Sequence, residues 1–130
     1  MSFTVHKSDI GAVPPNEYIP AATGEYRAGQ LLAMSGGNLA KVATASTTTP
    51  PYVCMAEKKI EEAGDVLAVN RVSKDIIYET SLSAAAASAA PGGKLQVSAG
   101  GEQVSTGSGT FEVVSLDGTA AGSIVRGRFA

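Results

Sequence analysis

The chain has 130 residues and a formal net charge of −2, and charged residues make up only 17% of it, against roughly 25% in soluble domains in general. Its length indicates one domain with one hydrophobic core, and because no basic cluster exceeds Lys58-Lys59, nucleic acid is not an expected partner. The single cysteine excludes an internal disulfide, and no segment approaches the ~20 apolar residues of a membrane helix, so no membrane partner is expected either.

Residues 1–27 are predicted to form an extended N-terminal arm. Pro14, Pro15 and Pro20 favour extended backbone and remove hydrogen-bond donors. We expect residues 1–20 to be mobile in the free protein and to become ordered on assembly. The first residues lack the positive start and apolar run of a signal peptide, so we expect a protein that is made and used in a cytosol or in something assembled there.

From Ala28 onward, short apolar segments alternate with turn signals at the spacing of about 8–12 residues that is typical of all-β proteins. Residues 52–58 are apolar on both faces, as in a strand that is covered on both sides. We therefore predict an all-β fold, a small β-barrel or sandwich that spans residues 28–130 as one domain. The nine expected strands are 30–34, 39–43, 52–58, 65–72, 76–80, 94–98, 103–105, 110–116 and 123–129.

Residues 81–90 are rich in alanine and serine and are the only helix candidate. Alanine has the highest helix propensity, but a segment of about ten residues is marginal alone. We expect at most one short helix here, or a plain connector over residues 81–91.

The connector separates two halves with similar turn and strand signals. Glycines recur at an offset of 64 positions at Gly29 and Gly93, and of 58 positions at Gly64 and Gly122. A shared series of signals at a nearly constant offset predicts a duplicated β-module. The first module is expected at about 28–80 and the second at about 92–130.

Residues able to carry out catalysis are few. The only histidine, His6, lies in the expected mobile arm, and one His with one Cys does not make a zinc site. Four acids surround Lys58 and Lys59, which is typical of a solvated loop more than of an acid–base pair; they are Glu57, Glu61, Glu62 and Asp65. We expect neither an enzyme nor a cofactor.

Two other comparisons carry little weight. Gly107-Ser108-Gly109 precedes an expected strand and lacks the Gly-Lys-Ser/Thr of a phosphate-binding loop. A small duplicated β-domain is also typical of biotinyl or lipoyl carriers, but no lysine here is flanked by methionine, and Met55-Ala56-Glu57-Lys58 is the nearest approach.

Several segments resemble the small head decoration, or cement, proteins of tailed bacteriophages and prophages. The resemblance covers residues 25–130 and rests on short glycine-containing motifs. The Ala/Ser stretch 81–90 departs from it. The motifs are residues 26–32, 51–53, 63–69 and 122–129.

The resemblance implies a structural virion protein that binds the outside of a capsid shell, assembles in the bacterial host cytoplasm and stabilises the shell. It implies the major capsid protein as partner, and commonly a homotrimer. The arm would dock on the shell through Phe3, Val5, Ile10, Pro14, Pro15, Tyr18, Ile19 and Pro20. The alternatives are a small ligand- or cofactor-carrying β-domain, or another virion part such as a tail or neck protein.

Overall fold

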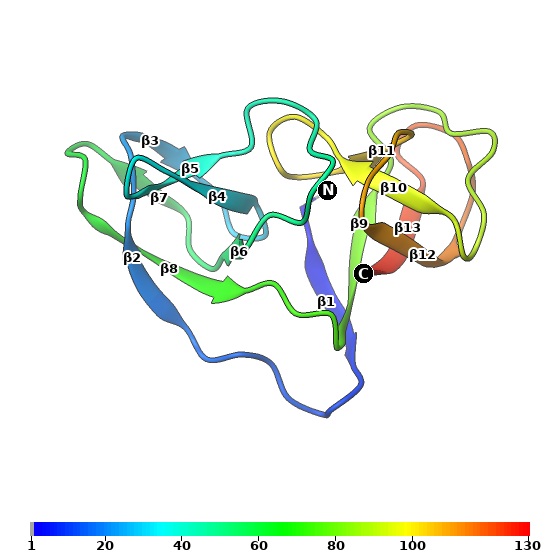
Figure 1. Ribbon diagram of the computed structural model, residues 1–130, viewed down its shortest axis with the longest axis horizontal. Coiled ribbons are helices and arrows are strands. Elements are labelled where there is room, and N and C mark those ends of the chain that lie inside the picture. The colour runs from blue at the N-terminus through cyan, green and yellow to red at the C-terminus, as the bar shows by residue number, and fades with distance from the viewer. Residues whose placement is uncertain (1) are drawn as a thin grey trace.

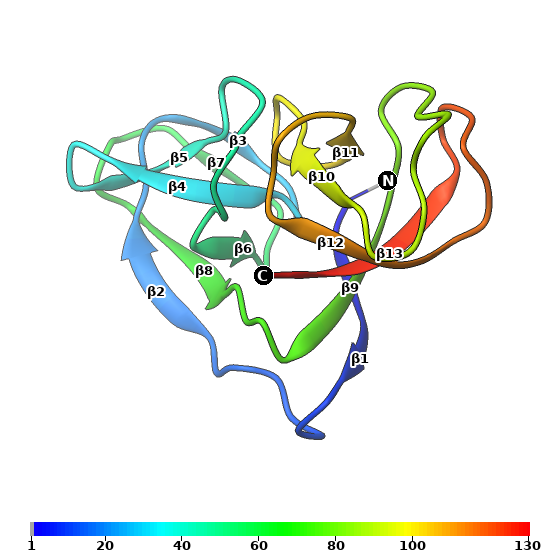
Figure 2. The same cartoon turned by 45° about the vertical axis from the view of Figure 1, so that its right-hand side comes forward.

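The computed structural model describes residues 2–130, and over that range the protein contains thirteen strands and no helix. All strand pairs are antiparallel, and they form three sheets. The all-β prediction is therefore confirmed, and the residues 81–90 contain no helical turn. Figures 1 and 2 show the two larger sheets as two lobes that lie side by side.

The six-stranded sheet carries most of the second half of the chain and one strand from the N-terminus. Its order is β1-β9-β13-β12-β10-β11. The strands are β1 (Thr4–Ser8), β9 (Ile76–Ser81), β13 (Ile124–Phe129), β12 (Phe111–Leu116), β10 (Lys94–Val97) and β11 (Val104–Ser105).

The five-stranded sheet comes from the first half and has the order β2-β8-β6-β4-β5. A two-stranded sheet, β3-β7, accompanies it. The strands are β2 (Glu17–Pro20), β8 (Val66–Arg71), β6 (Tyr52–Cys54), β4 (Leu31–Ser35), β5 (Asn38–Lys41), β3 (Gly24–Tyr26) and β7 (Lys58–Ile60).

Each larger sheet curls around its own apolar cluster without closing into a barrel. In the five-stranded sheet, one isolated bridge links Ala21, directly after β2, with Leu39 in β5. In the six-stranded sheet, one isolated bridge links Leu82, directly after β9, with Val104 in β11. The open ladders fit a small β-sandwich better than a closed barrel. Both faces of β6 are buried, as expected, since Tyr52 and Cys54 face one cluster and Val53 the other.

The same order of strands occurs in both halves. The sequence β2-β8-β6-β4-β5 in the first sheet corresponds to β9-β13-β12-β10-β11 in the second. The registers also correspond, and so do the backbone hydrogen bonds at the strand ends. The Gly29 N–H donates to the Cys54 carbonyl in the first module, as the Gly92 N–H donates to the Val113 carbonyl in the second. Likewise the bond from Gly64 N–H to the Ala21 carbonyl corresponds to that from Gly122 N–H to the Leu82 carbonyl. The bond from Val72 N–H to the Pro51 carbonyl corresponds to that from Ala130 N–H to the Thr110 carbonyl. This agreement is what two related β-modules require.

The limits of the two modules differ from those expected. The repeated ladders begin at Glu17 and at about Tyr78, so β2 and β3 belong to the first module and β9 belongs to the second. In the second module, the Ala/Ser stretch lies where the first module has residues 21–27. In the first module this segment includes β3, which pairs with β7. In the second module no such strand pair forms within the described chain, and one hydrogen bond, from Ala86 N–H to the Thr119 carbonyl, lies at the corresponding place.

The N-terminal residues are also placed differently from the expected separate arm. Strand β1 pairs with β9, and Phe3 is buried in the cluster of the six-stranded sheet at 2% exposure. Phe3 N–H donates to the Gly29 carbonyl at 2.9 Å. The burial of the Phe3 ring and the pairing of β1 with β9 hold this segment against its own domain. The prolines in residues 1–27 gave no sign of either contact.

Candidate docking face and pocket

The eight residues expected to dock on a partner lie in three different environments. Phe3 is in the core, and Ile19 is partly buried against the cluster of the five-stranded sheet. Pro15 and Pro20 are exposed, and Pro14 lines a pocket. Val5, Ile10 and Tyr18 are exposed, Tyr18 at 68%. Phe3 is thus unavailable to a partner in this structure, whereas these last three side chains are accessible.

Tyr18 belongs to an outward apolar face of the five-stranded sheet. It lies directly opposite Ala68, whose carbonyl accepts a hydrogen bond from Met55 N–H at 2.9 Å. Val66, two residues before Ala68 on β8, points to the same side and pairs with Pro20. Tyr18, Met55 and Val66 are all exposed large hydrophobic residues. We call this surface, Tyr18, Pro20, Met55, Val66 and Ala68, the apolar face.

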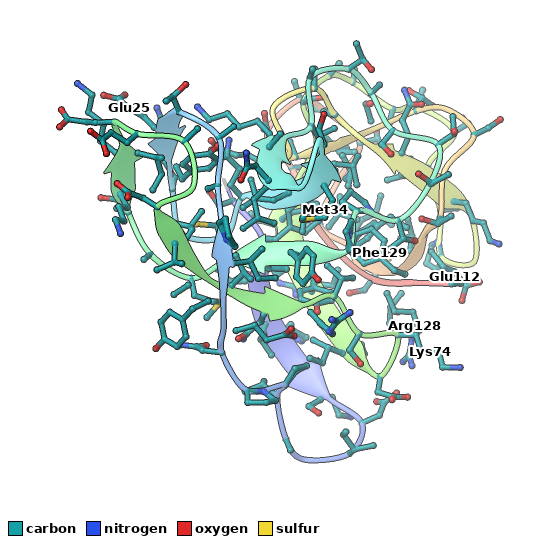
Figure 3. The ribbon with its side chains drawn as sticks, turned by 60° about the vertical axis from the view of Figure 1, so that its left-hand side comes forward. Glu25, Met34, Lys74, Glu112, Arg128 and Phe129 are labelled. Carbon is teal, nitrogen blue, oxygen red and sulfur yellow. The ribbon has the colours of Figure 1, made fainter. Side chains whose placement is uncertain are left out.

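On the six-stranded sheet, the counterparts of two of these five residues are charged. The pair Tyr18–Ala68 corresponds to Glu79–Arg126, whereas Pro20–Val66 corresponds to Ser81–Ile124. A neighbouring row, Lys94–Glu112–Arg128, corresponds to Leu31–Val53–Asn70, which lies outside the apolar face. We call Glu79, Arg126, Lys94, Glu112 and Arg128, with their partners His6, Asp9 and Asp117, the charged face. Figure 3 shows Glu112 and Arg128 near each other at one edge of the molecule.

Ion pairs neutralise much of the charged face. Arg126 Nε lies 2.8 Å from Glu79 Oε2, and Arg126 also contacts Asp117 at 3.1 Å. Hydrogen bonds to Asp117 and Glu79 raise the pKa of Arg126. Arg128 pairs with Asp9. A surface of this kind is ordinary for contact with water, whereas an exposed face that carries Tyr18, Met55 and Val66 is not.

A pocket of about 350 Å³ adjoins the apolar face, between β1 on one side and β6 and β8 on the other. Its lining is mainly apolar and includes the side chains of Phe3, Val5 and Val53. Asn70 also lines it, and because Asn70 is the direct cross-strand partner of Val53, both side chains point to the same side of the sheet. Met55 belongs to both the pocket and the apolar face.

Arg71, Tyr78 and Cys54 also line the pocket, and each of them has a partner. Arg71 Nε lies 2.9 Å from Glu17 Oε2, and its guanidinium stacks over the Tyr52 ring at 5.3 Å. The Tyr78 hydroxyl accepts a hydrogen bond from Ser73 N–H at 3.1 Å. The Cys54 thiol donates to the Ala56 carbonyl at 3.0 Å. Burial raises the pKa of this thiol, although that hydrogen bond opposes the shift.

Residues considered for catalysis do not come together. The four acids Glu57, Glu61, Glu62 and Asp65 are exposed, and Lys59 lies 3.9 Å from Glu61. His6 Nδ1 is 3.5 Å from Glu79 on the charged face. Within residues 2–130, no group of three or more His, Cys, Asp or Glu side chains could hold a metal ion.

Sequence reasoning did not identify Asn70, Met55 or Val66 as surface or pocket residues. Met55 and Val66 are hydrophobic and lie in the predicted strands 52–58 and 65–72, a pattern that favours the core, but both are exposed. Their outward direction depends on the register of β6 and β8, which local hydrophobicity does not determine when both faces of a strand are apolar.

No family model matches this chain, and no curated protein is similar to it. In the part of the chain that the structure describes, no helix has the length and hydrophobicity needed to cross a membrane.

Proposed function

We propose that this protein is a structural virion component that binds the outside of a phage capsid shell and stabilises it. The observation that supports this proposal best is the contrast between the two modules. At one equivalent cross-strand pair, one module carries the ion pair Glu79–Arg126 and the other carries Tyr18 and Ala68, where Tyr18 is exposed together with Met55 and Val66. Large exposed apolar patches on soluble proteins mark interaction sites, so the apolar face is the surface that a partner would cover.

The proposed partner is the major capsid protein, and the protein itself would act as a homotrimer on the assembled shell. Several copies that bind neighbouring shell subunits gain affinity from effective concentration even where each contact is weak. Val5 and Ile10, on and after β1, are exposed like Tyr18 and extend the proposed contact surface. A tyrosine near the centre of such a surface is a typical binding hot spot.

The proposal can be tested by co-sedimentation of the purified protein with expanded capsids of the virus that encodes it. Tyr18→Glu places on the apolar face the charge that its counterpart Glu79 carries on the charged face. We expect a loss of shell affinity of at least about tenfold, because an unpaired charge would be buried in the contact. Glu112→Gln on the charged face is the matched control and should change affinity by less than about twofold.

Two results would contradict the proposal. One is no co-sedimentation of the wild-type protein with any form of the shell. The other is equal loss of binding in Tyr18→Glu and Glu112→Gln. The oligomeric state is measured separately by analytical ultracentrifugation of the free protein and by the stoichiometry on the shell.

A further inference from the structure

The segment that contains β1 is joined to the rest of the chain by an exposed hinge. Residues 9–16 contain no strand, and all of them are exposed except Pro14, which is partly buried. Figures 1 and 2 show them as a loop that leaves one end of β1 and runs outside both larger sheets to β2. We call residues 2–8 the β1 segment and residues 9–16 the hinge. The β1 segment lies at the edge of its sheet, where strand order allows it to leave without breaking another strand pair.

The contacts of the β1 segment depend on its sequence and not on the copy that supplies it. Phe3 fills the cluster of the six-stranded sheet, and β1 forms its ladder with β9. Asp9, the first hinge residue, pairs with Arg128. These contacts lie outside residues 10–16, so the β1 segment of a second copy of this chain would make the same contacts in the same place.

The hinge itself has features that favour an open form. Gly11 has a φ of 71° in a tight turn, and its N–H bond within that turn is 3.3 Å long. An exposed bond of this length contributes little net stability. Ile10 and Val13 are 68% and 52% exposed in the closed hinge. The eight hinge residues span at most about 27 Å when extended, and an open hinge that crosses between two copies can bury both side chains against the neighbour.

We propose that copies of this protein exchange their β1 segments, so that the segment of each copy completes the six-stranded sheet and the core cluster of a neighbouring copy. Exchange of an identical element is a low-cost route to an oligomer, because the closed chain already contains every contact of the exchanged form outside the hinge. Cyclic exchange among three copies gives the homotrimer of the proposed function. The number of copies therefore rests on that function, whereas the exchange needs no shell.

The exchange is tested by a disulfide across the ladder. Thr4 on β1 lies opposite Glu79 on β9, at a Cα separation that a disulfide can bridge. The double variant Thr4→Cys/Glu79→Cys is purified, oxidised and run on a denaturing gel without reductant. We expect covalent trimers in which peptide mapping finds the two introduced thiols joined between chains.

The matched control, Thr4→Cys/Glu62→Cys, places the second thiol in an exposed loop that does not pair with β1. It should form few links, because only chance collisions bring those thiols together. A double variant Thr4→Cys/Glu79→Cys that is found only as an internally linked monomer would overturn the exchange, and so would equal linking of the two double variants.

The role of the hinge is tested with two substitutions at Gly11, where a Cβ would meet nothing within 4 Å. Proline cannot adopt the positive φ of this turn, so Gly11→Pro opens it, whereas asparagine tolerates that conformation. We expect the dissociation constant of the oligomer, measured by analytical ultracentrifugation, to be at least about tenfold lower in Gly11→Pro than in Gly11→Asn. Equal or weaker association of Gly11→Pro would contradict this role of the hinge.

The outcomes separate the exchange from the proposed function. Covalent trimers of a protein that binds no shell would leave the exchange standing and overturn the function. Internally linked monomers that still decorate shells would overturn the exchange alone. Covalent dimers would support the exchange and contradict the homotrimer.

Discussion

At the residue scale, the structure pairs Gly29 with Gly92 and not with Gly93 as the repeat in the sequence predicted, because the N–H groups of Gly29 and Gly92 donate to the equivalent carbonyls of Cys54 and Val113. Gly29 is required for two reasons and Gly92 for one. Both glycines have positive φ, 84° and 87°. A Cβ at Gly29 would also lie 2.5 Å from the Phe3 carbonyl oxygen, whereas a Cβ at Gly92 would meet nothing within 4 Å. Gly29 therefore holds β1 close to the first module, while Gly92 serves only its own turn.

We expect Gly92→Ala to lower the free energy of unfolding by about 1–2 kcal/mol, the usual cost of the left-handed region for a residue with a Cβ. Gly29→Ala should cost more, because the backbone of Phe3 must also move. Chemical denaturation of the two variants measures the difference. Equal losses would show that the close approach of Phe3 is not maintained in solution.

A second residue-scale prediction concerns alkaline pH. Burial raises the pKa of the Cys54 thiol above its unfolded value of about 8.5. Above that pH the unfolded chain loses the thiol proton before the folded chain does. The stability due to the neutral thiol is complete below pH ~8.5 and is lost as the pH rises through the folded-state pKa.

The free energy of unfolding should therefore fall between pH 8 and 9.5 more steeply in the wild type than in Cys54→Ala, by up to about 1.4 kcal/mol per pH unit. Cys54→Ala will be less stable at every pH because of the cavity it creates, so the comparison is one of slopes. Parallel curves for the two proteins would contradict the prediction.

Gly127 shows how one position differs between the modules. Its counterpart on β8 is Val69, since both lie opposite equivalent residues of the neighbouring strands. A Cβ at Gly127 would lie 2.7 Å from the Phe111 ring. Phe111 and Phe129 pack with their ring centroids 5.2 Å apart, so the aromatic rings occupy the space that a valine takes in the first module.

At the scale of elements, β1 has a different role from the residue that precedes it. Phe3, just before it, is in the core, whereas Val5 is exposed and lines the pocket. Phe3→Ala should lower the free energy of unfolding by about 3–5 kcal/mol. Val5→Ser should change it by less than about 1 kcal/mol and instead weaken shell binding.

Denaturation and co-sedimentation of the same two variants measure both effects. A stable Phe3→Ala protein with weakened shell binding would restore the arm that the sequence predicted. Deletion of residues 1–20 is a less specific test, because it removes Phe3, β1 and β2 together and we expect it to unfold the domain.

Many of the strands that the sequence predicted are joined by short local turns. The predicted strands 30–34 and 39–43 correspond to β4 and β5, which form a hairpin with Gly36 and Gly37 at positive φ. The four missed strands, β1, β2, β3 and β7, pair with segments far along the chain, β3 with β7. Residues 1–27 contain three prolines, and only a distant partner strand makes their extended segments part of a sheet.

The candidate site was less accessible to sequence reasoning than the fold. Val5, Ile10 and Tyr18 could be selected as apolar residues in an extended segment, and they are exposed. Asn70 could not be selected, since an asparagine in an apolar strand has no recognisable signal. Its place in the pocket lining comes from its position opposite Val53 and from β1, which completes the pocket.

At the scale of the whole molecule, the two modules share side chains. Leu31 and Val53 from the five-stranded sheet belong to the cluster of the six-stranded sheet. Leu31 N–H donates to the Gly101 carbonyl at 2.7 Å, and Gln30 Nε2 donates to the Gly100 carbonyl at 2.9 Å. The turn between β10 and β11 is thus attached to the first module.

Because of these contacts, we expect the two modules to unfold in one transition although each has its own cluster. Urea unfolding followed by circular dichroism should coincide with unfolding followed by NMR signals from each module. Leu31→Ala should keep the single transition and shift it to lower urea. Two separate transitions in the wild type would show that the shared contacts contribute little.

The pairing of β1 with β9 also has a consequence for synthesis. Thr4 leaves the ribosome first, but its partner Glu79 follows some 75 positions later. At elongation rates of about 5–20 residues per second, Phe3 and Val5 remain for roughly 4–15 s without the strand that covers them. During that interval the nascent chain exposes apolar residues at its N-terminus, so a slow stretch of codons between residues 20 and 75 should increase aggregation of this protein more than the same stretch placed after residue 100.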